Sequence, residues 1–214
     1  MDIFIRNELE KDYRQVEELT REAFWNLYVP GCNEHYLVHI MRDHPDFISK
    51  LDFIAIYKEK IIGNIMYSKS YLMDKKDSNH KIDTITFGPA SVLPEYQRKG
   101  VGYSLIKHSI EIASENEYKA IIILGHPNNY CKHGFKSSKD FNISDTQGKY
   151  PYGLLVLEIE KGIFQDFNWI YYPSDIYNID QNSCEVFDRQ FKPKKKDYKY
   201  TQEEFSIACR AYLI

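Results

Sequence analysis

The pattern of apolar and polar positions divides roughly the first 160 residues into alternating strands and helices. Strict alternation and short apolar runs favour strands, whereas apolar residues three and four apart favour helices. The expected strands are 2–6, 51–57, 61–72, 82–93, 120–124 and 154–159. The expected helices are 10–28, a second one capped by Asn33 and ended by His44-Pro45, 100–116, and a short one at 128–133.

Two details of these strands indicate the fold class. The strand 120–124 (AIIIL) is a continuous apolar run, which is typical of a buried central strand. Gly88-Pro89 lies inside the strand 82–93, and because proline cannot donate to a ladder we expect a bulge there. Strand–helix–strand units mixed with hairpins favour an α/β (α+β) fold, built on a mixed, mostly antiparallel sheet flanked by helices.

The chain changes character at about Phe164, where Tyr, Asp and Lys become frequent and aliphatic residues rare. We therefore expect a core domain over residues 1–162 and a C-terminal extension, residues 163–214, packed on it. Thr201–Glu204 (TQEE) fits a capping box that would open a last helix.

Composition narrows the function classes. With 214 residues and a net charge of −3, the chain lacks the basic balance of a nucleic-acid binder. It has no apolar run of about 18 residues and no apolar leader segment, so we expect a cytoplasmic protein without membrane contact. Its four cysteines form no C-x-x-C pair and are expected to be free thiols. A monomer and a homodimer both stay open.

The segment Val92–Tyr103 (VLPEYQRKGVGY) carries the most chemical information. It contains the pattern Q-x-x-G-x-G, formed by Gln97, Arg98, Lys99, Gly100, Val101 and Gly102, at the end of a strand and the start of a helix. Glycines let the backbone approach a ligand closely, and the free N–H groups of a helix N-terminus favour an anion. This segment therefore predicts a diphosphate site. Neither the nucleotide-triphosphate loop nor the dinucleotide fingerprint is present.

A second motif follows about thirty residues later. Directly after AIIIL the chain reads GHPNNYCKHGF, which contains Y-x-x-x-G-F from Tyr130 to Phe135. The two motifs, in this order, resemble the acetyl-coenzyme A loop and the later tyrosine element of the GNAT superfamily of N-acetyltransferases. The resemblance covers about residues 1–160, and within that superfamily it is strongest to small bacterial acetyltransferases of undefined acceptor.

The resemblance implies acetyl-coenzyme A (acetyl-CoA) as cosubstrate and direct transfer of its acetyl group to a primary amine of an undefined acceptor. The aromatic and acidic content of the helices up to Asp46 suits a small cationic amine slightly better than a protein tail. It implies that Val92 and Leu93 offer backbone hydrogen bonds to the pantetheine arm, that Gln97 through Tyr103 hold the diphosphate, and that Asn128 binds a pantetheine amide. Tyr130 would be the general acid, since a phenol with a pKa of about 10 stays protonated at neutral pH.

The general base is less well defined. Many relatives carry a glutamate on the strand before the loop, but here Thr84–Ser91 contains no carboxylate. Glu34 is the candidate for base or acceptor binding and His35 for acceptor binding, and an amine that arrives neutral would need no base. A rival reading is an acetyl-CoA-binding sensor or interaction module of the same fold. A third alternative is an acyltransferase that uses a longer acyl chain than acetyl.

We expect no metal site. His35 and His39 are four residues apart, a spacing that can bind zinc, but no third ligand accompanies them.

Overall fold

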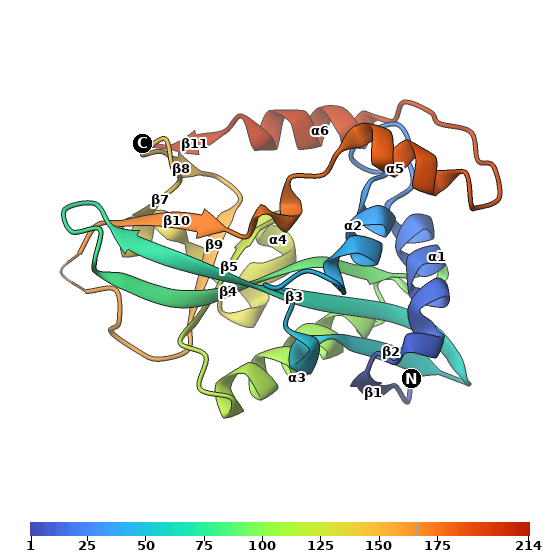
Figure 1. Ribbon diagram of the computed structural model, residues 1–214, viewed down its shortest axis with the longest axis horizontal. Helices are drawn as coiled ribbons and strands as arrows, with labels where there is room; N and C mark the ends of the chain where they lie inside the picture. The colour runs from blue at the N-terminus through green and yellow to red at the C-terminus, as the bar shows by residue number, and fades with distance from the viewer. Residues whose placement is uncertain (166) are drawn as a thin grey trace.

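A computed structural model describes residues 1–165 and 167–214 (Figure 1). Within these residues nine strands form one sheet in the order β1-β2-β3-β4-β5-β9-β6, with β10 on β3 and β7 on β10. The bounds are β1 (Phe4–Asn7), β2 (Phe53–Tyr57), β3 (Lys60–Asp74), β4 (Lys81–Val92), β5 (Ala120–Leu124), β6 (Lys136–Ser137), β7 (Ile143–Ser144), β9 (Leu154–Glu158) and β10 (Trp169–Pro173). Only β4–β5 and β10–β7 pair in parallel, which confirms the expected mixed, mostly antiparallel sheet.

The described residues also contain six α-helices and a second, two-stranded sheet made by β8 (Tyr150–Pro151) and β11 (Tyr212–Leu213). The helices are α1 (Tyr13–Phe24), α2 (Glu34–Met41), α3 (Val101–Glu115), α4 (Pro127–Tyr130), α5 (Gln181–Asp188) and α6 (Tyr200–Cys209). Short 3-10 turns cover Glu10–Asp12, Ser49–Leu51, Pro94–Tyr96, Cys131–His133, Ser138–Phe141 and Asp175–Tyr177. None of the described helices is long and apolar enough to cross a membrane.

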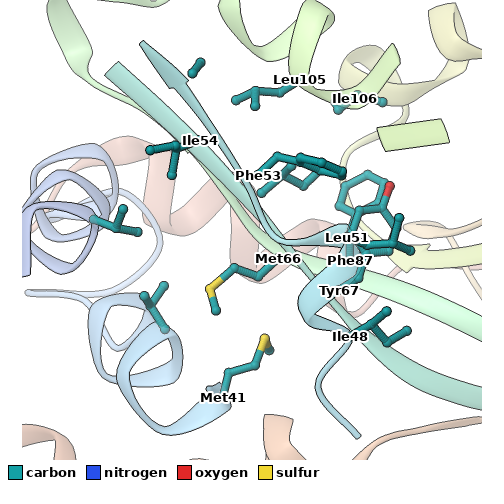
Figure 2. Close-up of a cluster of buried hydrophobic side chains, with 14 of the residues drawn as sticks. Met41, Ile48, Leu51, Phe53, Ile54, Met66, Tyr67, Phe87, Leu105 and Ile106 are labelled. Atoms are coloured by element: carbon teal, nitrogen blue, oxygen red, sulfur yellow. The ribbon is translucent and has the colours of Figure 1, made fainter. Parts of the chain in front are cut away.

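Helices cover both faces of the sheet, and two neighbouring residues of β3 show why. A Cβ at Gly63 would lie 3.0 Å from Leu105 Cδ1, so the missing side chain lets α3 pack closely on that face. Asn64 points to the other face, where its Oδ1 accepts from Thr20 of α1 (3.3 Å). Figure 2 shows the resulting core, with Leu105 on one side of the strands and Met41 of α2 on the other.

The long strand β3 has two partners along one edge. β2 pairs with its first half, up to Ile65, and β10 pairs with its second half, from Ser70 to Asp74. The segment after residue 163 therefore adds a strand to the central sheet as well as helices around it.

Strand β4 is irregular at Gly88-Pro89, a cis peptide bond. The ladder with β3 shifts register between Ile65 and Tyr67, opposite this dipeptide, which confirms the expected bulge. On its other edge β4 pairs with β5 only at Ile85 and Ile121. The two strands therefore separate toward their carboxyl ends, which leaves an opening in the sheet.

The expected capping box at Thr201 is wrong. Helix α6 begins two residues earlier than such a cap would place it, at Tyr200; its N-cap is Lys199, and no side chain caps it. The Thr201 hydroxyl instead donates to the carbonyl of Leu27 (2.8 Å), so a tertiary contact takes the group that the local motif would have used.

Candidate active site

A pocket of about 400 Å³ lies where β4 separates from β5. Residues from β3, β4, the loop before α3, α3 itself and the α4 region surround it. They are Asn64, Ala90, Ser91, Val92, Gln97, Arg98, Gly100, Val101, Gly102, Tyr103, Leu105, Ile106, Asn129, Tyr130, Lys132 and His133. Both sequence motifs thus meet at one pocket, as expected of two parts of a single site.

The loop before α3 has the geometry of an anion cradle. Gly100 takes φ +89°, a left-handed conformation that favours glycine, and a Cβ there would meet no atom within 4 Å. The first intrahelical donor is Ser104, whose N–H reaches the Gly100 carbonyl (2.9 Å). The N–H groups of the first helical residues are therefore left for a ligand, and the exposed Arg98 and Lys99 add positive charge beside them.

The backbone hydrogen bonds of Val92 and Leu93, at the end of β4, differ. The Leu93 N–H donates to the carbonyl of Ile62 (2.9 Å), and the Leu93 carbonyl accepts from Tyr96 (2.8 Å). Because bonding directions alternate along an antiparallel strand, the Val92 N–H points away from β3, toward the opening beside β5. Val92 can therefore offer its N–H to a ligand, whereas both backbone groups of Leu93 are already bonded.

The side chains of Gln97 and Asn128 are not placed as the simplest form of the cofactor expectation would have them. Gln97 turns back on its own loop and donates from Nε2 to the carbonyl of Val92 (3.0 Å). Asn128 is exposed and lies outside the pocket lining, whereas Asn129 is part of it. The side chain at the pocket is thus the next one along the short helix α4.

Lys132 and His133 were missed by the sequence analysis. The His133 ring stacks on Tyr103 at 4.7 Å between centroids, which joins the turn after α4 to the first turn of α3 at the pocket. Burial and the neighbouring Lys132 lower the pKa of His133, so its ring is neutral at pH 7. The sequence did offer a signal for them, because both are basic and lie inside the Y-x-x-x-G-F element, shortly after its tyrosine.

Tyr130 is positioned by aromatic packing. Its ring lies 5.6 Å from Phe87 on β4 and 6.1 Å from Phe135, between centroids. Burial, and next the nearby Tyr28, raise the pKa of Tyr130 to about 12. The hydroxyl therefore keeps its proton throughout the neutral range and is available as a donor.

Gly125, directly after β5, makes room for that ring. A Cβ at Gly125 would lie 2.3 Å from Tyr130 Cε2, closer than two carbon atoms can approach. We expect Gly125→Ala to displace the ring and, if Tyr130 is the proton donor, to lower kcat by about 10- to 100-fold, because small misplacements of a catalytic group are costly. Steady-state kinetics would measure this.

The Tyr130→Phe background provides the control for Gly125→Ala. If the added methyl acts only by moving the hydroxyl, it should lower kcat little further in that background. An equal loss in both backgrounds would show that Gly125 acts through another part of the site.

Glu34 and His35, adjacent at the start of α2, face different surroundings. Burial raises the pKa of Glu34, and the N–H of Asn33 donates to its Oε2 (3.0 Å). The charge of Glu34 in turn raises the pKa of Tyr28, after burial. Glu34 therefore lies within electrostatic range of Tyr28.

His35 is fully buried and packs against α5 instead. Its Nε2 lies 3.0 Å from Asp188 Oδ1, and its ring lies 5.2 Å from that of Phe191. Burial lowers its pKa to about 4, so the ring is neutral. With no exposed surface, His35 supports the contact between α2 and α5 and is not placed to bind an acceptor.

The two histidines of α2 do not converge on a metal. His39 Nδ1 lies 2.9 Å from Glu17, whereas His35 faces Asp188. Among the described residues His44, Asp46 and Asp175 do come together, with ligand atoms within 4.8 Å. Asp175 lies 3.1 Å from His44, and Ser174 donates to Asp46 (2.7 Å), so protein partners already engage these groups.

A buried polar cluster, two of whose residues line the pocket, was also missed. Thr20, Asn64 and Ser91 bond to one another across α1, β3 and β4, and all three are nearly inaccessible. Asn64 Nδ2 has no hydrogen-bond partner among the described residues. Each residue belongs to a different element, so no local pattern could have grouped them.

Comparisons with known proteins bear on both the family and the fold. The chain is 33% identical over 88 residues to YjhQ of Escherichia coli, an uncharacterized N-acetyltransferase; this match spans 40% of the chain and 46% of that protein. The E. coli GNAT family N-acetyltransferase YhbS, solved in complex with CoA, superposes with TM-score 0.70 at 18% identity, over 83% of this chain and 92% of that one. A GNAT family acetyltransferase from Brucella melitensis, solved in complex with acetyl-CoA, superposes with TM-score 0.62 at 19% identity, over 82% of this chain and 98% of that one.

At these identities the likeness to the two solved structures establishes the fold. The family itself is shown by residues 8–135, more than half of the chain, which match the acetyltransferase (GNAT) family. That range contains both motifs of the pocket, the Gln97–Gly102 loop and the Tyr130–Phe135 element. The chain belongs to the acetyltransferase (GNAT) family.

Proposed function

We propose that this protein transfers the acetyl group of acetyl-CoA directly to a primary amine of a small molecule. The observation that carries the proposal is the single pocket in which the free N–H groups of the α3 N-terminus, the Val92 backbone and Tyr130 meet. These are the three parts that the reaction needs: an anion site, a donor beside the pantetheine arm, and a proton donor.

The cofactor site fits a long, anionic ligand. The left-handed Gly100 leaves open space at the α3 N-terminus for a diphosphate, with Arg98 and Lys99 beside it. Ala90, Val92 and other apolar residues also line the pocket, which suits an uncharged arm. The CoA and acetyl-CoA found in the two similar structures are consistent with this arrangement.

Glu34 is the group that would bind or deprotonate the amine. Its raised pKa makes it a better proton acceptor near neutral pH than an exposed carboxylate. Its charge raises the pKa of Tyr28, which in turn raises that of Tyr130, and this supports a carboxylate and an aromatic ring within electrostatic range of Tyr130. A carboxylate beside aromatic rings suits a cationic amine of small size.

Titration of acetyl-CoA into wild type and Gly100→Trp tests the cofactor site. An indole at position 100 would occupy the open space of the cradle, so we expect acetyl-CoA to bind at least about tenfold more weakly, or 1.4 kcal/mol. Calorimetry measures the affinity directly.

Gly148→Trp is the matched control for that titration. Gly148 also has a positive φ (+76°) and open space around its missing Cβ, but it lies outside the pocket lining. Equal affinities in all three proteins would reject the proposed cradle. Absence of binding to the wild type would reject the transferase and the sensor alike.

A sensor that binds acetyl-CoA without using it is the second candidate, because β4 carries no carboxylate near the pocket. A screen of amines with the wild type separates the two candidates. Acetylated product supports the enzyme, whereas tight acetyl-CoA binding with no product from any amine supports the sensor.

A further inference from the structure

The C-terminal segment is joined to the loop between α1 and α2 by buried polar contacts. Asn26, at φ +60° and 5% exposed, is the centre of these contacts. Its Oδ1 accepts from the N–H of Gly31 (2.8 Å) and of Asp197 (3.0 Å), and its Nδ2 donates to the carbonyl of Lys195 (3.1 Å). The segment before α6 is therefore held firmly on this loop.

The start of α6 is attached to the same loop. Gln202, 7% exposed, donates from Nε2 to the carbonyl of Asn26 (3.1 Å) and to that of Asp197 (3.0 Å). Thr201 donates to the carbonyl of Leu27 (2.8 Å). Gln202 is the one buried residue among the ten of α6, all of which the structure describes. The helix is thus fixed at its first turn and lies shallowly on the protein beyond it.

The face of α6 that continues from Gln202 meets Tyr28. The Phe205 ring stacks on Tyr28 with centroids 4.4 Å apart and planes 28° apart. Cys209, one turn further, is close enough to influence Tyr28. Glu34 raises the pKa of Tyr28, and Tyr28 in turn raises that of Tyr130, so the three side chains lie within electrostatic range of one another.

The far end of α6 is attached to the segment that follows β8, which leads to the glycine beside Tyr130. After the helix the Ala211 carbonyl accepts from the N–H of Tyr152 (2.9 Å), and β11 pairs with β8. Gly153 then accepts from the N–H of Gly125 (2.8 Å), the glycine that packs against the Tyr130 ring. Figure 1 shows α6 crossing from the region of α2 and α5 to β8 and β11.

We propose that α6 forms the outer side of the acceptor site and that Phe205 limits the size of the amine that reaches Tyr130. The proposal rests on the proposed acetyl transfer and adds the element that selects the acceptor. A helix of ten residues is about 15 Å long, and the two ends of α6 are attached to the loop between α1 and α2 and to Tyr152. The site it encloses suits a short cationic amine, held between Glu34 and the Tyr28 ring. It would exclude the end of a polypeptide chain.

Acceptor kinetics with Phe205→Ala test this proposal. The probes are primary amines of increasing bulk, from ethylamine and short diamines to a tetrapeptide with a free N-terminus. The wild type should acetylate the short amines and leave the tetrapeptide unmodified. Phe205→Ala should raise kcat/KM for the bulky amines about tenfold relative to the short ones, with acetyl-CoA affinity unchanged. Ile207→Ala, on the same helix and 57% exposed, should match the wild type.

Hydrogen exchange of the backbone gives a reading that needs neither cofactor nor acceptor. Loss of the Phe205 ring should speed exchange in the peptide covering residues 127–133, around Tyr130, and Ile207→Ala should not. If the wild type acetylates no amine, the proposed function fails while this exchange result still decides the position of α6. Unchanged exchange in Phe205→Ala, or equal acetylation of tetrapeptide and short amines by the wild type, would overturn the inference.

Discussion

Replacing Tyr130 by Phe is expected to lower kcat by about 10²- to 10⁴-fold, the range usual for loss of a general acid or base. The ring would keep its packing against Phe87 and Phe135, because only the hydroxyl is removed. Affinity for acetyl-CoA should therefore change less than about twofold. A loss confined to kcat is the signature of an interaction made in the transition state.

The pH profile provides a second test of Tyr130. Because burial raises the pKa of Tyr130 to about 12, its hydroxyl stays protonated well above the usual range of a phenol. The donor should thus persist through pH 10, and wild-type kcat should show no alkaline fall from this group below that pH. An alkaline limb near pH 9 that disappears in Tyr130→Phe would contradict the assigned pKa.

Tyr118→Phe is the matched control for the same substitution. Tyr118 is also partly buried, with a pKa raised by burial, but it lies after α3 and outside the pocket lining. It should keep wild-type turnover. If Tyr130→Phe kept it as well, the acid role would be rejected and the proton would have to come from elsewhere, for instance from water.

The parts of the site that depend on contiguous residues could be predicted from the sequence. The Gln97–Gly102 loop lies at a helix N-terminus because two glycines and a following apolar face specify that local structure. Tyr130 lies at the same pocket because β4 and β5 are neighbours in the sheet, which the order of the two motifs already indicated. Local pattern and sheet topology therefore agree at the centre of the site.

Residues whose surroundings come from distant segments could not be predicted. His35 and Glu34 are adjacent in the sequence, yet α5, some 150 residues later, buries one and leaves the other beside Tyr28. Asn128 and Asn129 illustrate a smaller effect. Successive side chains of a helix point about 100° apart, so one step decides which of them borders the pocket.

Replacing Trp169 by Ala is expected to lower the free energy of unfolding by about 3–5 kcal/mol, the usual result for a fully buried aromatic residue. Trp169 is 0% exposed, and its indole N–H donates to the carbonyl of Phe164 (3.2 Å). It packs in a second hydrophobic cluster, separate from the core shown in Figure 2, with Leu72, Ile122 and Leu154, which come from β3, β5 and β9. For a chain of this size the loss corresponds to a fall in Tm of roughly 10 °C, measurable by thermal or urea unfolding.

Trp25→Ala provides the comparison, since it removes the other tryptophan of the chain. Trp25 is only partly buried, with its N–H donating to the carbonyl of Lys195 (3.0 Å) and Arg21 over its ring. We expect its loss to cost about 1–2 kcal/mol. Equal costs for the two substitutions would contradict a central role for Trp169.

The position of Trp169 in the sheet indicates where the folded unit ends. The composition of the chain places a boundary near residue 162, but Trp169 lies on β10, which pairs with β3 from Trp169 to Pro173. A truncation at 162 would remove both this strand and the largest side chain of the second cluster. We therefore propose that the folding unit includes at least β10. If the cost of Trp169→Ala is large, β10 belongs to the same folding unit as the sheet that borders the pocket.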